Sequence, residues 1–344
     1  MIAQGAEAPR PRTRLSSGKL PPTLLEGLLR LRGAPDPRVL VGPRCGEDAA
    51  VILLGRHRLV LKSDPVTFTA TDIGWYVVQV NANDVAVMGA RPCWFQPTIL
   101  LPPGTRAADV SAIARQIHRA CRGLGIAVTG GHTEVTDAVT RPVIAGDMQG
   151  LLVGSRIITS AGAHPGDRVV MTKAAGLEGT AILAEDCARE LSEHVPASML
   201  GAARQLRRRP GISVVTEALA AARHGVSAMH EPSEGGVRAA LHEIAHASRH
   251  RLRVDLDRVP VLPETNRLAR HFGIDPLGLV ASGALLVTIA PRRVPGLLRH
   301  WARHGIGAAV IGRVERGRGV WASRRGRRVP FPWIAQDEII RALA

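Results

Sequence analysis

The stretch from Thr71 to Pro92, TDIGWYVVQVNANDVAVMGARP, constrains the fold more than any other part of the chain. Thr71 is predicted to be the N-cap of a helix, with Asp72 in the first turn, where a negative charge is favourable. The apolar residues of this helix recur at intervals of three and four, at Ile73, Val77, Val80, Val87 and Met88. That spacing also places Asp84 on the apolar line. A carboxylate on a packed face is costly unless it is paired or binds a metal, so Asp84 is either a hydrogen-bonded structural residue or a ligand.

The order of the other predicted elements indicates a sheet covered by helices. Apolar runs predict strands at 49–54, 58–63, 93–102, 126–135 and 141–154. The clearest helix follows Pro103, carries its apolar residues on one face and ends at Gly123 or Gly125. This order is typical of the α+β or α/β class. A chain of 344 residues is long enough for two domains, and a second mixed unit is expected to begin near residue 160.

The charge of the chain is strongly positive. The formal net charge is +16, and lysines occur only at positions 19, 62 and 173, so nearly all of the cations are arginines. Arginines cluster at 10–14, 207–209 and 313–328, the last cluster together with Trp321. A nucleic-acid surface would explain such clusters, but solvated charge runs are the simpler interpretation. Nucleic acid is therefore not an expected partner.

The remaining composition predicts a cytoplasmic protein without membrane association. No apolar run reaches the length of a membrane span, and the first twenty residues have no apolar core of the signal-peptide type. They predict a disordered, basic lead-in. The four cysteines, at positions 45, 93, 121 and 187, form no CxxC pair, which argues against a zinc site or a disulfide framework.

Three aspartates have a similar setting along the first half of the chain. Asp48 precedes a predicted strand, Asp64 follows the next strand, and Asp84 lies on the apolar line of the helix. Strand ends and helix faces of one sheet domain can converge in space. Three carboxylates would then form an oxygen-rich site of the kind that suits Mg²⁺ with substrate phosphates. The flanking hydroxyl and amide side chains are Ser63, Thr67, Asn81 and Asn83.

Three glycine-rich loops have both a functional and a structural interpretation. TGGHTEV (129–135) and KAAGLEGTAIL (173–183) could contact phosphate, the second because helix N-terminal amides favour anions. Neither is a Walker A or GxGxxG motif, and a plain turn between strand and helix is the alternative. HEPSEGG (230–236) is either a substrate loop or a capping loop in which Ser233 caps the next helix.

Together these segments resemble the superfamily of aminoimidazole ribonucleotide (AIR) synthase, which includes thiamine-monophosphate kinase, selenophosphate synthetase and the hydrogenase-maturation protein HypE. The matching segments are GEDAAVI (46–52), SDPVTF (63–68), NANDVAVMGARP (81–92), GGHTEV (130–135), GDRVVMTKAAGLEGTAILA (166–184) and HEPSEGGVRAALHEIA (230–245). DPLGLVASGALLVTI (275–289) resembles the late strand segment of the HypE branch.

The resemblance implies an α+β fold of two PurM-like domains, each a sheet covered by helices, and a homodimer in which the N-terminal sheets pair. The expected parts are an N-terminal extension with a short helix (1–38), an ATP-binding domain (39–160), a second domain (161–320) and a basic tail (321–344). The resemblance also implies that ATP binds through Mg²⁺ rather than through a P-loop. On the matching motifs the metal ligands are Asp48, Asp64 and Asp84, and the nucleotide-binding residues are Asp48, Asp64, Asn81, Asp84, Gly130, Gly131 and Thr133.

Three departures from the family pattern bear on the chemistry. His132 stands where the kinase branch has the acidic residue of GGDT, and Glu134 could take over that role. HEPSEGG has Glu231 and Glu234 where the HypE pattern HDPTRGG has Asp and Arg. HypE ends in a cysteine that carries a carbamoyl group, whereas this sequence ends in DEIIRALA and its last cysteine is Cys187. HypE chemistry on the chain's own terminus is therefore not expected.

The sequence thus predicts an ATP- and Mg²⁺-dependent enzyme of the AIR synthase-related, HypE-like group, which activates an oxygen of a small-molecule substrate by phosphoryl transfer. The catalytic candidates are Lys173, His132 and Glu134. Two alternatives stay open. One is a small-molecule kinase of the thiamine-monophosphate type. The other is a non-catalytic ATP-binding scaffold that assists a maturation protein, for example in hydrogenase assembly.

Overall fold

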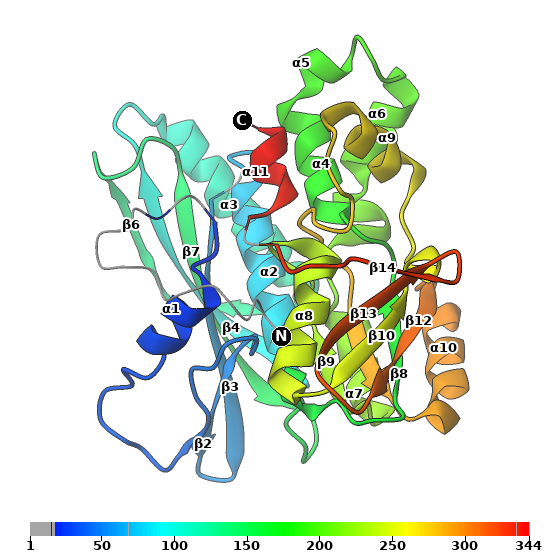
Figure 1. Cartoon of the computed structure of the whole chain (residues 1–344). Helices are drawn as coiled ribbons and strands as arrows, with labels where there is room; N and C mark the ends of the chain where they lie inside the picture. The colour runs from blue at the N-terminus through cyan, green and yellow to red at the C-terminus, as the bar shows by residue number, and fades with distance from the viewer. Residues whose placement is uncertain (1–14, 16–17, 68, 335, 344) are drawn as a thin grey trace. The chain divides into compact units, whose positions relative to one another are not determined.

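The computed structural model describes residues 15, 18–67, 69–334 and 336–343 (Figure 1). Most of the expected lead-in at 1–20 lies outside the described residues. The chain forms two compact units. The N-terminal unit comprises residues 36–42 and 48–157, and the C-terminal unit comprises residues up to 35, residues 43–47 and residues from 158 onward. None of the helices in the described part of the chain combines the length and apolarity that a membrane span requires.

The N-terminal unit contains one mixed seven-stranded sheet. Its strands are β1 (Val39–Val41), β2 (Ala50–Leu54), β3 (His57–Val66), β4 (Ala90–Leu101), β5 (Ala127–Val128), β6 (His132–Val135) and β7 (Val143–Leu152). The order is β1-β2-β3-β7-β4, and both β5 and β6 pair with β4 at the far edge. Successive neighbours from β1 to β4 are antiparallel, whereas β5 and β6 run parallel to β4.

Helix α2 (Ile73–Val87) is the central element of this unit. It lies against α3 (Ala107–Leu124) and against strands β3, β4 and β7. Every residue of α2 except Val80 is buried, including the polar residues Gln79, Asn81, Asn83 and Asp84. Glycines on β7 permit this close packing, because a Cβ at Gly150 would overlap Val85 and a Cβ at Gly146 would overlap Asn81.

The start of α2 differs from the expected one. The N-cap is Asp72, in the left-handed region at φ 52° and without a side-chain cap, so the predictions of Thr71 as N-cap and Asp72 in the first turn are wrong. Burial on all sides fixes this helix without a cap. The prediction for α3 is confirmed: it ends at Leu124, and Gly125 follows in the left-handed region at φ 69°.

The C-terminal unit contains a second seven-stranded sheet, in the order β14-β13-β10-β12-β8-β11-β9 (Figure 1). The strands are β8 (Arg168–Thr172), β9 (Ala228–His230), β10 (Arg251–Asp255), β11 (Leu286–Ile289), β12 (Ala308–Glu315), β13 (Gly319–Arg324) and β14 (Arg327–Val329). The helices are α1 (Pro22–Leu28), α4 (Leu177–Asp186), α5 (Ala188–Leu191), α6 (Ala197–Gln205), α7 (Val215–Arg223), α8 (Gly236–Ser248), α9 (Pro263–Phe272), α10 (Val294–Arg303) and α11 (Glu338–Ala342). Short helical turns lie at η1 (Ser160–Gly162), η2 (Arg207–Gly211), η3 (Leu256–Arg258) and η4 (Pro291–Arg293).

The core of this unit lies between the sheet and α8. Leu252 and Val254 of β10 and Val314 of β12 pack with Leu241 and Ile244 of α8 in one buried cluster. The residues that alternate with them along the strands therefore lie on the opposite face of the sheet.

The last part of the chain differs from the basic tail expected at 321–344. The expected boundary at residue 321 falls inside strand β13, and β14 follows at the edge of the sheet. Asp337 and Ile339 are buried, and the Asp337 carboxylate accepts hydrogen bonds from the backbone N–H groups of Gly235 and Val280. The segment is thus part of the C-terminal unit, because strand pairing and burial outweigh its basic composition.

Candidate functional site

The N-terminal unit brings acidic side chains together at the contact between β3 and α2. Asp84 of α2 is 6% exposed, which confirms its expected burial. Lys62 and Asp64 are two residues apart on β3, so both side chains lie on the face of the sheet that α2 covers. The Lys62 Nζ atom lies 2.8 Å from Asp84 Oδ2 and 3.8 Å from Asp64 Oδ2. A buried ion pair thus connects the helix to the strand.

The charges of Lys62, Asp64 and Asp48 act on the pKa of Asp84, and the three aspartates act on the pKa of Lys62. Burial, assisted by the charges of Asp64 and Asp48, raises the pKa of Asp84 to about 7, against the opposing effect of Lys62. Burial alone would lower the pKa of Lys62, but Asp84, Asp64 and Asp48 raise it more, so that its net shift is upward. Lys62 is therefore a permanent positive charge among three carboxylates.

Asn81 connects α2 to the end of β3. Its Nδ2 atom donates to the carbonyl oxygens of Val77 (2.8 Å) and Asp64 (3.1 Å). Its Oδ1 atom is buried and has no hydrogen-bond partner. An unsatisfied buried acceptor is unusual, and here it lies on the residue that contacts the Asp64 backbone.

The sequence predictions missed Lys62. The signal for it was available, because Lys62 and Asp64 have the alternating spacing of one strand face and lysine is rare in this chain. The predicted strand ended at 63, whereas β3 continues to Val66. Asp64 is therefore a strand residue beside Lys62 rather than a loop residue after the strand.

The side-chain oxygens near Lys62 belong to the ligand type that Mg²⁺ prefers in proteins. Within the described ranges, no three side chains of His, Cys, Asp or Glu are arranged to hold a metal ion. The chemistry nevertheless fits Mg²⁺ bound with a nucleotide: the available ligands are carboxylate oxygens, and the buried Asn81 oxygen lacks a partner. Mg²⁺ generally takes one or two carboxylates and completes its coordination with water and phosphate oxygens.

The GGHTEV segment forms strand β6 at the edge of the sheet. His132 Nε2 and Glu134 Oε2 lie 3.1 Å apart, and their side chains are 63% and 48% exposed. Gly131 is required by close approach, because a Cβ there would overlap the Pro97 backbone. Since β6 is the third strand from β3, the two strands lie about 14 Å apart across the sheet.

Lys173 belongs to the C-terminal unit, where it has a structural setting. Its Nζ atom lies 2.7 Å from Glu217 Oε1 and donates to the carbonyl oxygens of Gly211 (3.1 Å) and Ser213 (2.6 Å). The side chain is 5% exposed. The structure therefore argues against the expected catalytic role of Lys173, because its three donors are already engaged.

The HEPSEGG loop is held by hydrogen bonds that the sequence did not predict. Helix α8 begins at Gly236 after Gly235 in the left-handed region, without a side-chain cap, so the structure does not support the interpretation of Ser233 as the cap of this helix. Glu231 is 2% exposed and accepts a hydrogen bond from the Gly283 N–H (2.9 Å).

His230 is part of a buried polar network. Ser160 Oγ lies 3.0 Å from His230 Nδ1, and His230 Nε2 lies 2.8 Å from Glu243 Oε2. Lys19 Nζ donates to Glu243 Oε1 at 3.1 Å. The neighbouring Lys19 and His230 lower the pKa of Glu243 well below its usual range, although burial acts in the opposite direction. Ser160 is fully buried, so the network positions the loop and does not expose a nucleophile.

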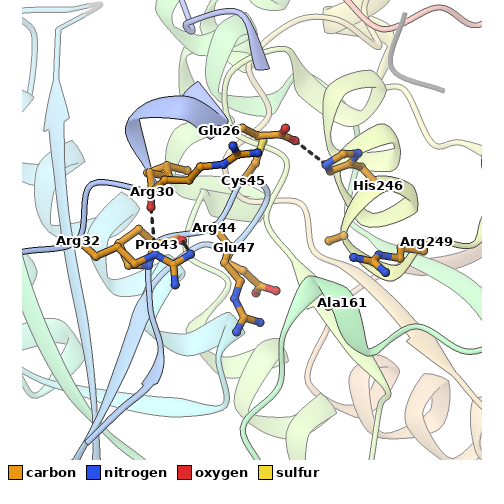
Figure 2. A pocket seen from close by; sticks show the side chains of 12 residues that line it. Glu26, Arg30, Arg32, Pro43, Arg44, Cys45, Glu47, Ala161, His246 and Arg249 are labelled. Carbon is orange, nitrogen blue, oxygen red and sulfur yellow. Dashed lines mark hydrogen bonds and ion pairs between the residues drawn. The ribbon is translucent and has the colours of Figure 1, made fainter. Parts of the chain in front are cut away.

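A cavity of about 400 Å³ lies in the C-terminal unit, among α1, residues 43–47 and the end of α8 (Figure 2). Its acids are engaged: Glu26 Oε1 lies 3.0 Å from His246 Nε2, and Glu47 accepts from the Ser160 N–H at 3.2 Å. Burial raises the pKa of the Cys45 thiol. The other charged side chains of the wall are Arg30, Arg32, Arg44 and Arg249. Because both of its acidic side chains are already engaged, no ligand is assigned to this cavity.

The two units correspond to the two domains of one family. Residues 46–152 match the AIR synthase related protein, N-terminal domain, and residues 164–322 match the AIR synthase related protein, C-terminal domain. The chain therefore belongs to the AIR synthase-related family, and the predicted superfamily and α+β fold are confirmed. Among its branches, the chain is HypE-like.

The chain is similar in sequence to proteins of the HypE branch and of the thiamine-monophosphate kinase branch. Carbamoyl dehydratase HypE of Rhizobium leguminosarum bv. viciae is 27% identical over 283 residues, which cover 79% of this chain and 77% of the relative. Thiamine-monophosphate kinase of Pyrococcus abyssi (strain GE5 / Orsay) is 30% identical over 296 residues, which cover 83% of this chain and 86% of the relative.

Solved structures share the fold over nearly the whole chain. HypE in complex with ATP matches with a TM-score of 0.67 and 22% identity, covering 94% of this chain and 98% of that chain. AaThiL complexed with AMPPCP and TMP matches with a TM-score of 0.70 and 21% identity, covering 90% and 94%. A chain of a HypE–HypF complex matches with a TM-score of 0.69 and 23% identity, covering 84% and 94%.

Proposed function

We propose that the chain is an ATP- and Mg²⁺-dependent enzyme of the HypE-like branch that transfers the γ-phosphoryl group of ATP to an oxygen of a small-molecule substrate. The observation that carries this proposal is the contact of Lys62 with both Asp84 and Asp64, together with the effect of the Asp48 charge on the pKa of Asp84. An acidic cluster with an internal cation is a suitable surface for a Mg²⁺–nucleotide, because the bound metal neutralises phosphate charge there.

The named relatives support this proposal. One is a carbamoyl dehydratase and another is a thiamine-monophosphate kinase. The solved structures of the same fold include a HypE in complex with ATP and a ThiL complexed with AMPPCP. Both branches are thus represented with an adenine nucleotide or its analogue.

The residues of the cluster have separate roles in the proposed reaction. Asp48, Asp64 and Asp84 would hold Mg²⁺, which would supply charge neutralisation for the phosphates, and Asn81 fixes α2 relative to β3. Lys62 keeps a positive charge beside the carboxylates. The substrate oxygen forms a bond to the γ-phosphorus as the bond to the ADP oxygen breaks, so positioning and charge neutralisation dominate the catalysis.

A second candidate is a small-molecule kinase of the thiamine-monophosphate type, favoured by the relative from Pyrococcus abyssi. His132 and Glu134 would contribute in that case, together with Gly130, Gly131 and Thr133 at the nucleotide. The two candidates differ in their products. A kinase leaves a stable phosphorylated product, whereas a dehydratase-type enzyme releases ADP and inorganic phosphate with a dehydrated substrate.

The proposal includes a homodimer, a maturation protein as partner and a cytoplasmic location. Trp94 on β4 is 36% exposed, and the face of the sheet on which it lies is opposite to the one that α2 covers. A partly apolar sheet face of this kind suits pairing of two N-terminal sheets. The likeness to a solved HypE–HypF complex supports a maturation partner. The four free cysteines suit a reducing compartment.

The test is calorimetric titration of the full chain with a non-hydrolysable ATP analogue, with Mg²⁺ and with EDTA. Asp84→Asn should weaken Mg²⁺-dependent binding at least about 100-fold, since one of three ligand charges is lost. The control is Asp109→Asn, which removes an exposed carboxylate of α3 that pairs with Arg106 and should leave binding unchanged. Binding that does not depend on Mg²⁺, or that Asp84→Asn leaves intact, would contradict the proposed function.

A further inference from the structure

Three arginines form a row across neighbouring strands of the C-terminal sheet. Arg253 of β10 is directly opposite Arg313 of β12, and Arg313 is directly opposite Arg168 of β8. Residues that are opposite in register point to the same face of a sheet. Like charges in such positions destabilise the strand pairing, so this row works against the stability of its own sheet.

The row lies on the face away from α8. Leu252, Val254 and Val314 alternate with these arginines and are buried in the core on the α8 side. The side chains of Arg253 and Arg313 are 54% and 49% exposed. The guanidinium groups are therefore accessible to a ligand from solvent.

Acidic side chains neutralise the row only in part. Glu315 Oε1 lies 2.7 Å from Arg313 Nε and 3.9 Å from an Arg253 nitrogen, so one carboxylate serves two arginines. For Arg168, the described part of the chain provides no ion pair. The row thus retains excess positive charge.

The row lines a hollow of about 490 Å³, within the usual size range of small-molecule sites. The charged side chains that line the hollow are four arginines and one aspartate, and together they carry a net charge of +3. Its polar and charged side chains are Arg168, Arg253, Asp255, Arg258, Arg313 and Ser323. The Asp255 carboxylate pairs with Arg258 at 3.3 Å, which leaves the three arginines of the row to face the hollow.

The positive surface continues to the edge of the sheet. Trp321 of β13 is opposite Arg253 on the other side of β10. The Cζ atoms of Arg251 and Arg328 lie 3.8 Å and 4.3 Å from the centre of the Trp321 ring. Cation–π contacts of this kind hold additional guanidinium groups beside the hollow.

We propose that this hollow binds a ligand with a chain of linked phosphate groups. Guanidinium forks match phosphate oxygens bidentately, and three arginines on adjacent strands span about 10 Å. A linear arrangement of this length fits successive phosphates better than one compact anion. The hollow belongs to the C-terminal unit alone, and the proposal does not depend on the aspartate cluster or on the proposed function.

The experiment measures binding of tripolyphosphate to the full chain by calorimetry in EDTA, so that Mg²⁺-dependent binding at the aspartates cannot contribute. Near physiological ionic strength, the dissociation constant should be about 10 μM. The triple variant Arg168→Gln, Arg253→Gln, Arg313→Gln should weaken binding at least about 30-fold, since it removes three charge-assisted contacts.

A charge-matched control separates the site from net charge. Arg115, Arg119 and Arg122 are exposed on α3 of the N-terminal unit, and their replacement by Gln changes the net charge equally. Binding to this control should stay within about twofold of the wild type. Equal loss in both triple variants, or no wild-type binding at about 1 mM tripolyphosphate, overturns the proposal.

The melting temperature distinguishes a ligand site from a structural role. Because the row opposes strand pairing, its triple variant should melt at the same temperature as the wild type or higher. If the triple variant melts at a lower temperature and also loses binding, Arg168→Ala alone decides. Weaker binding of tripolyphosphate to that variant at an unchanged melting temperature supports the proposal, and unchanged binding overturns it.

A second titration identifies the source of the phosphate chain. A fluorescent single-stranded oligothymidylate presents phosphodiesters, whereas tripolyphosphate is a free oligophosphate. Tighter binding of the oligonucleotide, lost in the triple variant and reduced by salt, assigns the hollow to a nucleic-acid backbone. Tighter binding of tripolyphosphate with the same loss assigns it to a free oligophosphate or to the phosphates of a small molecule.

Discussion

Replacement of Lys62 by Met should lower the free energy of unfolding by about 3–5 kcal/mol near pH 8, because it leaves the buried Asp84 carboxylate without its cation. Asp84 is 6% exposed, so water cannot take the place of the ammonium group. Urea unfolding of both proteins measures the difference. The double variant with Asp84→Asn should recover most of the loss, since no buried charge then remains.

The pH dependence of this effect follows from the pKa of Asp84. Its pKa in the folded protein is about 7, above the ordinary value of 3.8. The folded state therefore binds the Asp84 proton more tightly than the unfolded state, and stability rises as the pH falls through 7 towards 4. The Lys62→Met variant should thus lose less stability at about pH 5 than at pH 8.

The matched control for Lys62 is Arg106→Met, which breaks an exposed ion pair of similar length in the same unit, 2.8 Å between Arg106 Nε and Asp109 Oδ2. Exposed pairs contribute about 0–1 kcal/mol. If Lys62→Met costs no more than this control, the Lys62–Asp84 pair is not the buried connection between β3 and α2 that we describe.

Replacement of Glu243 by Gln should lower the free energy of unfolding by about 3–5 kcal/mol at neutral pH, because Lys19 and His230 both lose the charge that they contact. His230 is 4% exposed and connects Glu243 to Ser160. The expected consequence is a looser HEPSEGG loop, with a lower melting temperature by scanning calorimetry and faster amide exchange at residues 228–236.

The sign of the pH dependence is opposite to that of Lys62→Met. The pKa of Glu243 in the folded protein lies well below the ordinary value of 4.5. Its contribution is therefore fully present above about pH 4.5 and decreases as the pH falls further. The variant and the wild type should converge in stability at acidic pH.

Glu26→Gln is the matched control, because it breaks another glutamate–histidine pair of the C-terminal unit, to His246 at 3.0 Å. Both of those side chains are 41% exposed, so the cost should stay below about 1 kcal/mol. Equal costs for the Glu26 and Glu243 variants would show that burial does not strengthen the Glu243 network.

The burial of Asp84 was predictable from its own helix. The apolar residues around it recur at helical spacing, and a helix face is a local property of the sequence. The fold class was likewise predictable, since the order of strands and helices restricts the sheet architecture to a few forms. The N-cap of this helix could not be predicted in the same way. The preference of a residue for a helix end contributes little free energy compared with the burial of the whole helix.

Two lysines show why the contacts of a side chain are harder to predict than its burial. Lys173 followed a glycine-rich motif and was expected at a phosphate, yet Glu217 and two carbonyl groups surround its ammonium. Lys62 had no motif of its own, yet it contacts Asp84. In both cases the partner is distant in the chain, so only strand and helix packing could place it.

The sequence by itself determined the α+β class and the buried helix with Asp84, because both follow from local spacing and the order of the elements. The tertiary structure decided which charges meet: Lys62 with Asp84, Glu217 with Lys173, and three arginines in one row of the C-terminal sheet. The physical reason is that strand register and helix packing bring together residues that are distant in the chain, and a side chain's burial and partners depend on those contacts.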